Sequence, residues 1–157
     1  MNKSILIFIA VVIVAVVAYL LFQSKAKVGE TTPSVSAQLV TGENFKLSDL
    51  KGKTVYLVFW GSWCPPCRAE LPYWVEFYNN KNDENIEVVS IALEKKQGQA
   101  ARVSDKMNFP WSYQIEEVSG FVATNEFSRK YGVTDIPAAF KINPDGTLAE
   151  KLKGAPH

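Results

Sequence analysis

The sequence predicts a single small α/β domain built on a mixed β-sheet and preceded by an N-terminal transmembrane helix. The chain has 157 residues, of which 47% are hydrophobic and 12% aromatic, a composition that supports one packed core. Residues 5–22 are uniformly apolar, and two later apolar runs, 54–60 and 86–93, flank a segment with helical periodicity. A tight turn near the C-terminus joins two further strand-like segments. A parallel β-α-β unit completed by an antiparallel hairpin gives a mixed sheet.

The N-terminal apolar run, Ile5–Phe22, has about the length that crosses a bilayer as a helix, roughly 20 residues. A cleaved signal peptide is the alternative, but its apolar region usually spans about 7–15 residues and ends at a small-x-small site. Ser24-Lys25-Ala26 fits such a site poorly. We therefore expect an uncleaved signal-anchor over residues 1–24. Basic residues lie on both sides of the run, so charge alone leaves its orientation open.

The residues after this run divide into a tether and a globular domain. Residues 25–36 are polar and contain Gly, Pro, Thr and Ser, which predicts a tether. The globular domain then covers residues 37–157 and opens with a small hairpin whose strands flank residues 41–43. The segment 54–60, TVYLVFW, is apolar on both alternate faces, which is typical of a central strand covered by helices on each side.

A helix is predicted over residues 65–79, where four apolar residues from Leu71 to Tyr78 fall on one stripe. Pro72 lies inside it and is expected to kink it. The remaining predicted elements, in chain order, are a buried strand at 86–93, a helix at 99–107, an irregular stretch from Phe109, a short helix at 124–131 capped by Gly132, and strands at 138–142 and 147–152 joined by a turn at 143–146.

Charge and cysteine content exclude several functional classes. The net charge of +1 gives no sign of nucleic-acid binding. The chain has two cysteines and one histidine, His157, which is its last residue. A closed zinc site needs four ligands, and a protease-type nucleophile needs a histidine beside its cysteine. We therefore expect neither a metal site nor a cofactor.

The two cysteines, Cys64 and Cys67, carry the predicted chemistry. The buried strand ends at Trp60 and the chain turns into a helix, which places Cys64 at the helix N-terminus. The unpaired N–H groups and the helix dipole there stabilise a thiolate, so Cys64 is the expected nucleophile. Cys67 lies one turn further along and is expected to be the more buried, resolving thiol. This arrangement suits thiol–disulfide exchange through a mixed disulfide. An inert staple is the alternative, although so short a loop gains little from closure.

The sequence around the cysteines, FWGSWCPPCRAELP at 59–72, resembles the signature of the thioredoxin superfamily, specifically its TlpA/ResA branch of membrane-anchored thiol–disulfide oxidoreductases. The segments FKLSDLKG at 45–52, GVTDIP at 132–137 and INPDG at 142–146 resemble the same branch, so the resemblance covers about residues 37–154. It implies a thioredoxin-like fold, a domain in the periplasm or on the outer face, and exchange with protein thiols or disulfides. It also implies an upstream membrane thiol as electron donor, with cytochrome c maturation as one common role.

The resemblance also implies roles for single residues. Ile136-Pro137 should be a cis peptide that lies beside the disulfide and leaves the Ile136 backbone open to an extended substrate. Trp63 and Pro65 are expected to contact substrate as well. Glu94 is a candidate proton relay, and an ordinary solvated strand end is the alternative for it.

These residues leave three candidate functions and argue against a fourth. A reductase of protein disulfides is the first, and a disulfide oxidant or isomerase with the same chemistry is the second. A membrane-tethered, non-catalytic binding module is the third. A peroxidase on the same fold would need Thr or Ser three residues before the reactive cysteine and Pro seven before it. Gly61 and Leu57 occupy those positions, which argues against it.

Overall fold

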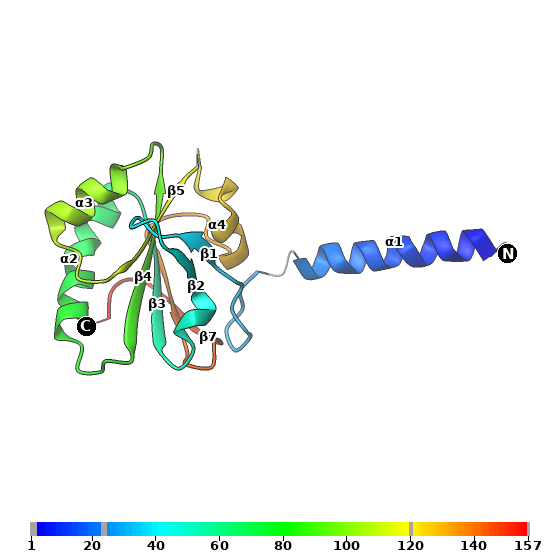
Figure 1. Cartoon of the computed structure of the whole chain (residues 1–157), viewed down its shortest axis with the longest axis horizontal. Coiled ribbons are helices and arrows are strands. Elements are labelled where there is room, and N and C mark those ends of the chain that lie inside the picture. The colour runs from blue at the N-terminus through cyan, green and yellow to red at the C-terminus, as the bar shows by residue number, and fades with distance from the viewer. Residues whose placement is uncertain (1–2, 23–24, 120, 157) are drawn as a thin grey trace.

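The computed structural model describes residues 3–22, 25–119 and 121–156, and its centre is a five-stranded mixed sheet (Figure 1). The strand order is β5-β4-β3-β6-β7. β3 runs parallel to β4, and β4 runs parallel to β5, whereas β6 and β7 are antiparallel to their neighbours. The strands are β3 (Thr54–Trp60), β4 (Ile86–Glu94), β5 (Tyr113–Val118), β6 (Ala138–Ile142) and β7 (Leu148–Leu152).

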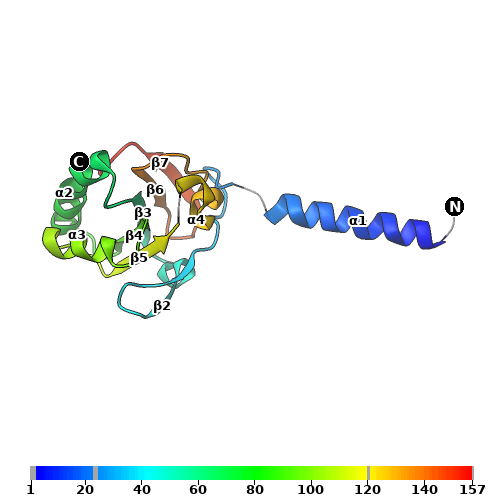
Figure 2. The ribbon, with the colours of Figure 1, turned by 90° about the horizontal axis from the view of Figure 1, so that it is seen from above.

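Helices cover both faces of this sheet, as Figure 2 shows from above. One face packs against α2 (Pro65–Asn80) and α3 (Gln99–Met107). The other packs against α4 (Glu126–Tyr131) and the small antiparallel sheet of β1 (Ser36–Gln38) and β2 (Asn44–Lys46). Two short 3₁₀ helices, η1 (Leu47–Leu50) and η2 (Val122–Thr124), complete the elements of the domain. The predicted thioredoxin-like arrangement of a mixed sheet between helices is therefore confirmed.

β3 is the central strand because its side chains alternate between the two cores. Leu57 and Phe59 lie with the α4 layer, whereas Val58 and Trp60 lie with the α2 and α3 layer. None of these four side chains is more than 3% exposed. The prediction of a strand covered on both sides is therefore confirmed, and so are the predicted hairpin, α2, β4, α3, α4, β6 and β7. The helix α2 continues through Pro72 to Asn80.

The stretch after Phe109 was expected to be irregular, and this expectation is wrong for residues 113–118. They form the edge strand β5, which pairs with β4 from Val89 to Glu94. Only Ile115 of the strand is fully buried, so the apolar signal in this segment is weak. These residues form a strand because they pair with β4, although their own sequence carries only a weak strand signal.

The expected tether, residues 25–36, also differs from the prediction, because the structure places it against the domain. Ala26 N–H donates to the Lys130 carbonyl at 2.8 Å, and Val35 is 1% exposed in the core of the α4 layer. The buried Tyr131 hydroxyl donates to the Pro33 carbonyl at 2.8 Å. Any residue except proline can donate a backbone hydrogen bond, so the polar composition of this segment gave no sign of these contacts.

The N-terminal helix α1 (Lys3–Phe22) precedes this segment. The side chains described for it, from residue 3 to residue 19, are exposed. Among the described residues, no helix was found that is long and apolar enough to cross a membrane.

Replacing Tyr131 with Phe tests whether residues 26–35 are held to the domain. The change should lower the free energy of unfolding by about 1 kcal/mol, because the Pro33 carbonyl loses its donor. Urea unfolding followed by tryptophan fluorescence measures the difference. Tyr113→Phe is the matched control, since the Tyr113 ring packs on Phe45 and its hydroxyl has no hydrogen-bond partner among the described residues. Equal stabilities of the two variants would contradict the assignment.

Candidate redox site

Cys64 lies where β3 gives way to α2, and it is the N-cap residue of that helix. Its backbone is extended, with φ −98° and ψ 107°, and Pro65 and Pro66 take the first two helical positions. Proline is favoured there because the first N–H groups of a helix have no intrahelical partner. The Cys64 Sγ accepts a hydrogen bond from the Cys67 N–H at 3.2 Å. The sulfur thus takes the place that a serine or aspartate oxygen fills in an ordinary helix cap.

Cys64 and Cys67 form a disulfide, with their Cα atoms 5.3 Å apart. Cys64 is 4% exposed and Cys67 is 1% exposed. The difference is small, but it has the expected sense, with Cys67 behind the first turn of α2. Both sulfurs lie in an apolar cluster that includes Trp60 and Leu71.

The loop between α4 and β6 brings a backbone carbonyl to the disulfide. The Ile136-Pro137 peptide is cis, which confirms that prediction. The Ile136 carbonyl oxygen lies 3.7 Å from the Cys64 Sγ. The pairing of Ala138 with Phe59 in the sheet fixes this loop beside the end of β3. Ile136 and Pro137 are half-buried, so an incoming chain can reach this loop.

Trp63 and Pro65, the other expected substrate contacts, are exposed next to Cys64. Trp63 is 41% exposed, and its Nε1 donates to the Leu93 carbonyl at 2.7 Å. The Lys95 ammonium lies 5.3 Å from the centre of the indole ring. The ring is therefore held in place at the surface, as a contact residue requires.

Glu94 is fully buried at the end of β4, with no exposed surface. Its Oε1 accepts the Ser62 N–H at 2.6 Å, and its Oε2 accepts the Ser62 hydroxyl at 2.7 Å. The alternative of a solvated strand end is therefore wrong. Burial raises the pKa of the Glu94 carboxyl; the two Ser62 bonds oppose this effect, and the nearby Glu116 charge adds to it. The group links β4 directly to the turn that carries Cys64.

Two partners in this network were absent from the sequence analysis. Ser62 holds both oxygens of Glu94, and Glu116 on β5 caps α3 by accepting the N–H groups of Gly98 and Ala100 at 2.7 and 2.8 Å. The spacing of Ser62 before Cys64 gave no signal, because its partner is 32 residues away. Glu116 could not be recognised as a cap because β5 itself had not been predicted.

Gly61 bears on the peroxidase alternative. A Cβ at this position would lie 2.9 Å from the Trp63 Nε1 and 3.1 Å from the Leu93 carbonyl oxygen. The threonine or serine that a peroxidase needs here would collide with that pair. The geometry therefore agrees with the sequence argument against peroxidase chemistry.

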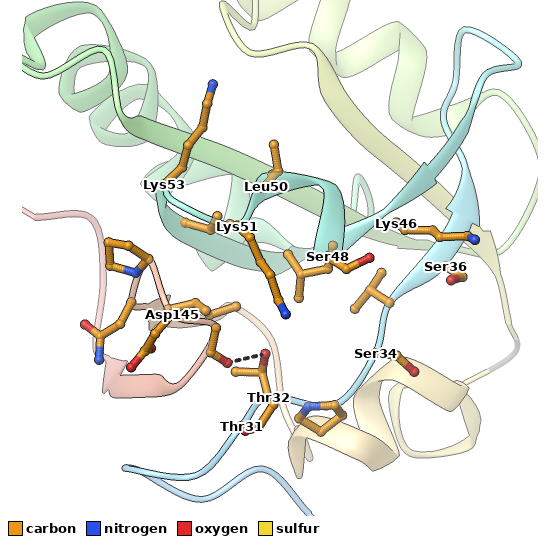
Figure 3. A pocket seen from close by; sticks show the side chains of 18 residues that line it. Thr31, Thr32, Ser34, Ser36, Lys46, Ser48, Leu50, Lys51, Lys53 and Asp145 are labelled. Atoms are coloured by element: carbon orange, nitrogen blue, oxygen red, sulfur yellow. Dashed lines mark hydrogen bonds between the residues drawn. The ribbon is translucent and has the colours of Figure 1, made fainter.

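A cavity of about 350 Å³ opens at the other end of β3, between residues 31–36, η1 and the turn after β6 (Figure 3). Lys51 extends toward Thr32 across it. Val55, the second residue of β3, lines this cavity, whereas the cysteines follow the last residue of the strand. The cavity is therefore separate from the redox site. Among the described residues, no cluster of three or more His, Cys, Asp or Glu side chains could hold a metal ion.

Comparison with known proteins places this geometry among disulfide-exchanging enzymes. Residues 28–151 match the model of the AhpC/TSA family. The chain is 31% identical over 163 residues to the thiol-disulfide oxidoreductase ResA of Bacillus thuringiensis subsp. konkukian, covering 98% of this chain and 91% of that protein. It is 30% identical to ResA of Bacillus subtilis, covering 80% of this chain and 67% of that one.

Solved structures agree with this comparison. A putative thiol:disulfide interchange protein DsbE from Chlorobium tepidum superposes with a TM-score of 0.70 at 28% identity, covering 84% of this chain and 89% of that one. The thioredoxin domain of a thiol-disulfide oxidoreductase from Bacteroides vulgatus gives a TM-score of 0.72 at 20% identity, covering 83% and 91%, which supports the fold alone.

Replacing Ser62 with Ala should raise the pKa of the Glu94 carboxyl further, because the Ser62 hydroxyl favours its charged form. Carboxyl ¹³C NMR of the oxidised protein across a pH titration measures the shift. Ser48→Ala, at the cavity end of the sheet, is the matched control and should leave Glu94 unchanged. A Glu94 titration that moves downward or stays in place in Ser62→Ala would contradict the contact.

Proposed function

The chain belongs to the AhpC/TSA family of thioredoxin-like proteins, and on this premise we propose that it is a membrane-anchored, extracytoplasmic reductase of protein disulfides. It is a thiol–disulfide oxidoreductase of the ResA and DsbE type. The observation that carries the proposal is the position of the Cys64 sulfur. It caps α2, lies 3.7 Å from the carbonyl oxygen of the half-buried Ile136, and is paired with the Cys67 sulfur one turn behind it.

The exchange proceeds in two displacements. The Cys64 thiolate attacks one sulfur of the partner's disulfide; a new S–S bond forms, and the partner's other sulfur leaves as a thiolate that takes up a proton. Cys67 then loses its proton and attacks the Cys64 Sγ. This step forms the Cys64–Cys67 disulfide and releases the partner's second thiol. The partner gains two electrons and two protons, and an upstream membrane thiol donor returns both to this chain.

The fold supports each displacement with fixed groups. The Cys67 N–H, which donates to the Cys64 Sγ, and the N-terminal end of the α2 dipole stabilise negative charge on that sulfur. Trp63, Pro65 and the Ile136-Pro137 loop surround that sulfur and are the proposed contacts for the partner's chain. Holding Cys67 one turn away gives the second step a high effective concentration.

Glu94 is proposed as the proton relay for the second step. Cys67 must lose a proton in an apolar cluster that offers few acceptors. The raised pKa of the Glu94 carboxyl, which burial causes, suits a group that accepts a proton and then donates it. Two hydrogen bonds attach the Glu94 carboxylate to Ser62, which lies two positions before Cys64 in the chain.

The N-terminal segment is proposed as the membrane anchor, with the catalytic domain outside the cytoplasm. The support is the uninterrupted apolar run Ile5–Phe22 together with the 20-residue helix α1, about 30 Å long at 1.5 Å per residue. The last three residues of α1, 20–22, have side chains outside the described set. Disulfide chemistry belongs in compartments where disulfides form, which favours the extracytoplasmic side.

The reductase direction rests on the resemblance to the ResA branch. Cytochrome c precursors, whose haem-binding cysteines must be reduced, are the proposed substrates. An oxidant or isomerase with the same residues would meet a broad set of secreted proteins instead. The partners captured by a trapping variant distinguish these alternatives.

Replacing Cys67 with Ala should trap partners as mixed disulfides, because the complex at Cys64 loses its internal resolving thiol. Non-reducing gels of membranes expressing the full chain display the adducts. Cys64→Ala is the matched control and should trap far less, since Cys67 lies behind the first turn of α2 and does not cap the helix. Equal trapping by both variants, or adducts with neither, would undo the assigned roles.

Alkaline phosphatase fused after Gly154 should be active and remain with the membrane fraction. The enzyme folds only where its disulfides can form, so activity reports an extracytoplasmic domain. Activity confined to the soluble fraction would instead indicate a cleaved signal peptide. An inactive, membrane-bound fusion would indicate the reverse topology.

A further inference from the structure

Two apolar side chains are exposed where the edge strand β5 ends. Val118 is 51% exposed, and Phe121 is 75% exposed, more than any other described large apolar side chain. The side chains that follow behave differently: Val122 packs against the core, and Phe127 is buried in it. Phe121 belongs to none of the described core clusters. Its ring therefore has no structural role in the described part of the chain that would explain a phenylalanine here.

The end of β5 that carries Val118 is connected to the redox site through β4. Val118 is opposite Glu94 in the register of β4 and β5, and the Ser119 N–H donates to the Glu94 carbonyl at 3.1 Å. Glu94 in turn holds Ser62, two residues before Cys64. Trp63 is bonded to Leu93, the neighbour of Glu94. In Figure 1 the connection from β5 to α4 lies at the same end of the sheet as the carboxyl end of β4.

We propose that Trp63, Val118 and Phe121 form an apolar docking strip for a bulky apolar side chain of the same polypeptide whose disulfide is exchanged at Cys64. The inference rests on the proposed function and specifies its substrate class: chain segments with a large apolar residue near the reacting cysteine. The occupant follows from continuity with the redox site. Trp63 is a proposed contact for the partner, and its ring is bonded to the end of β4, which pairs with β5. A partner that extends from Cys64 over Trp63 therefore continues toward Val118, and burial of Phe121 by that partner removes apolar surface from water.

The reach of the strip limits where the apolar residue lies in the partner. Two residues separate Cys64 from Ser62, one carboxyl contact leads to Glu94, one strand spacing leads to Val118, and three residues lead to Phe121. Together with the length of the Glu94 side chain, about 5 Å, these links span at most about 32 Å, which an extended chain covers in about ten residues. A residue within that distance of the partner's cysteine can reach the strip.

Paired substrates test the strip. The full chain, reduced and held in lipid nanodiscs, is given cysteine peptides blocked as mixed disulfides with thionitrobenzoate, whose release is followed by absorbance. One peptide set carries Leu at successive positions up to ten residues from the cysteine, and a matched set carries Ser. The small disulfide 5,5′-dithiobis(2-nitrobenzoate) measures exchange without a docking segment.

Phe121→Ser should lower the second-order rate constant for thionitrobenzoate release from the best Leu peptide about tenfold, the scale expected for one buried large apolar side chain, and change the rate with the small disulfide less than twofold. Phe121→Leu should retain most of the selectivity, which guards against a folding defect. Val28→Ser is the matched control, because Val28 is 61% exposed in the segment bonded to the start of β7.

Other outcomes overturn the proposal. Equal losses with the Leu peptide and the small disulfide would show that Phe121 affects the exchange reaction and not the docking of a chain segment, which overturns the proposal. If Phe121→Ser keeps the preference for Leu over Ser, the substrate does not bind the Phe121 ring. The ring would then contact a lipid surface or a second copy of this chain. If the unsubstituted chain reduces the small disulfide but shows no preference for Leu, the strip is refuted and the proposed function stands. Failure to reduce the small disulfide would refute the proposed function as well.

Discussion

The side chains of β3 alternate between the two buried cores, and this packing fixes the strand at the centre of the sheet. After Trp60 the backbone must leave the layer and enter α2, so the first residues of the helix lie at the carboxyl edge. Cys64 caps the helix there with its sulfur. The reactive atom is thus positioned by the core of the domain, and the loop at Ile136 reaches it because β6 pairs with the same strand. Rigid positioning of this kind is what a group that must meet an incoming sulfur requires.

The features predicted from sequence are those encoded locally. Each of these features can be recognised from a few consecutive residues. They are the strand that is apolar on both faces, the proline pair at the start of α2 and the glycine after α4. β5, the packing of residues 26–35 and the burial of Glu94 depend on partners far along the chain, so no local pattern reveals them. Glu94 is the sharpest case: beside Lys95 and Lys96 it resembles a surface residue, yet it is closed in by Ser62 from 32 residues earlier.

Glu94 connects three parts of the site that the sequence keeps apart. Its carboxylate holds the turn before Cys64, and its backbone carbonyl holds Ser119 at the end of β5. The neighbouring Leu93 carbonyl holds the Trp63 ring. With Glu94 as the proposed proton relay, these attachments link the proton balance of the exchange to the surface proposed to meet the partner.

The packing of residues 26–35 against the domain limits the distance between the domain and the proposed membrane anchor. With α1 embedded as proposed, about four residues link Phe22 to the first bonded residue, Ala26, a reach of at most about 14 Å. A free leash to Ala37 would reach about 50 Å. Because accessible volume grows as the cube of reach, the attachment point explores only about 2% of the space that such a leash would permit. Under the proposed anchoring, the catalytic domain stays at the bilayer surface, and its substrates meet it there.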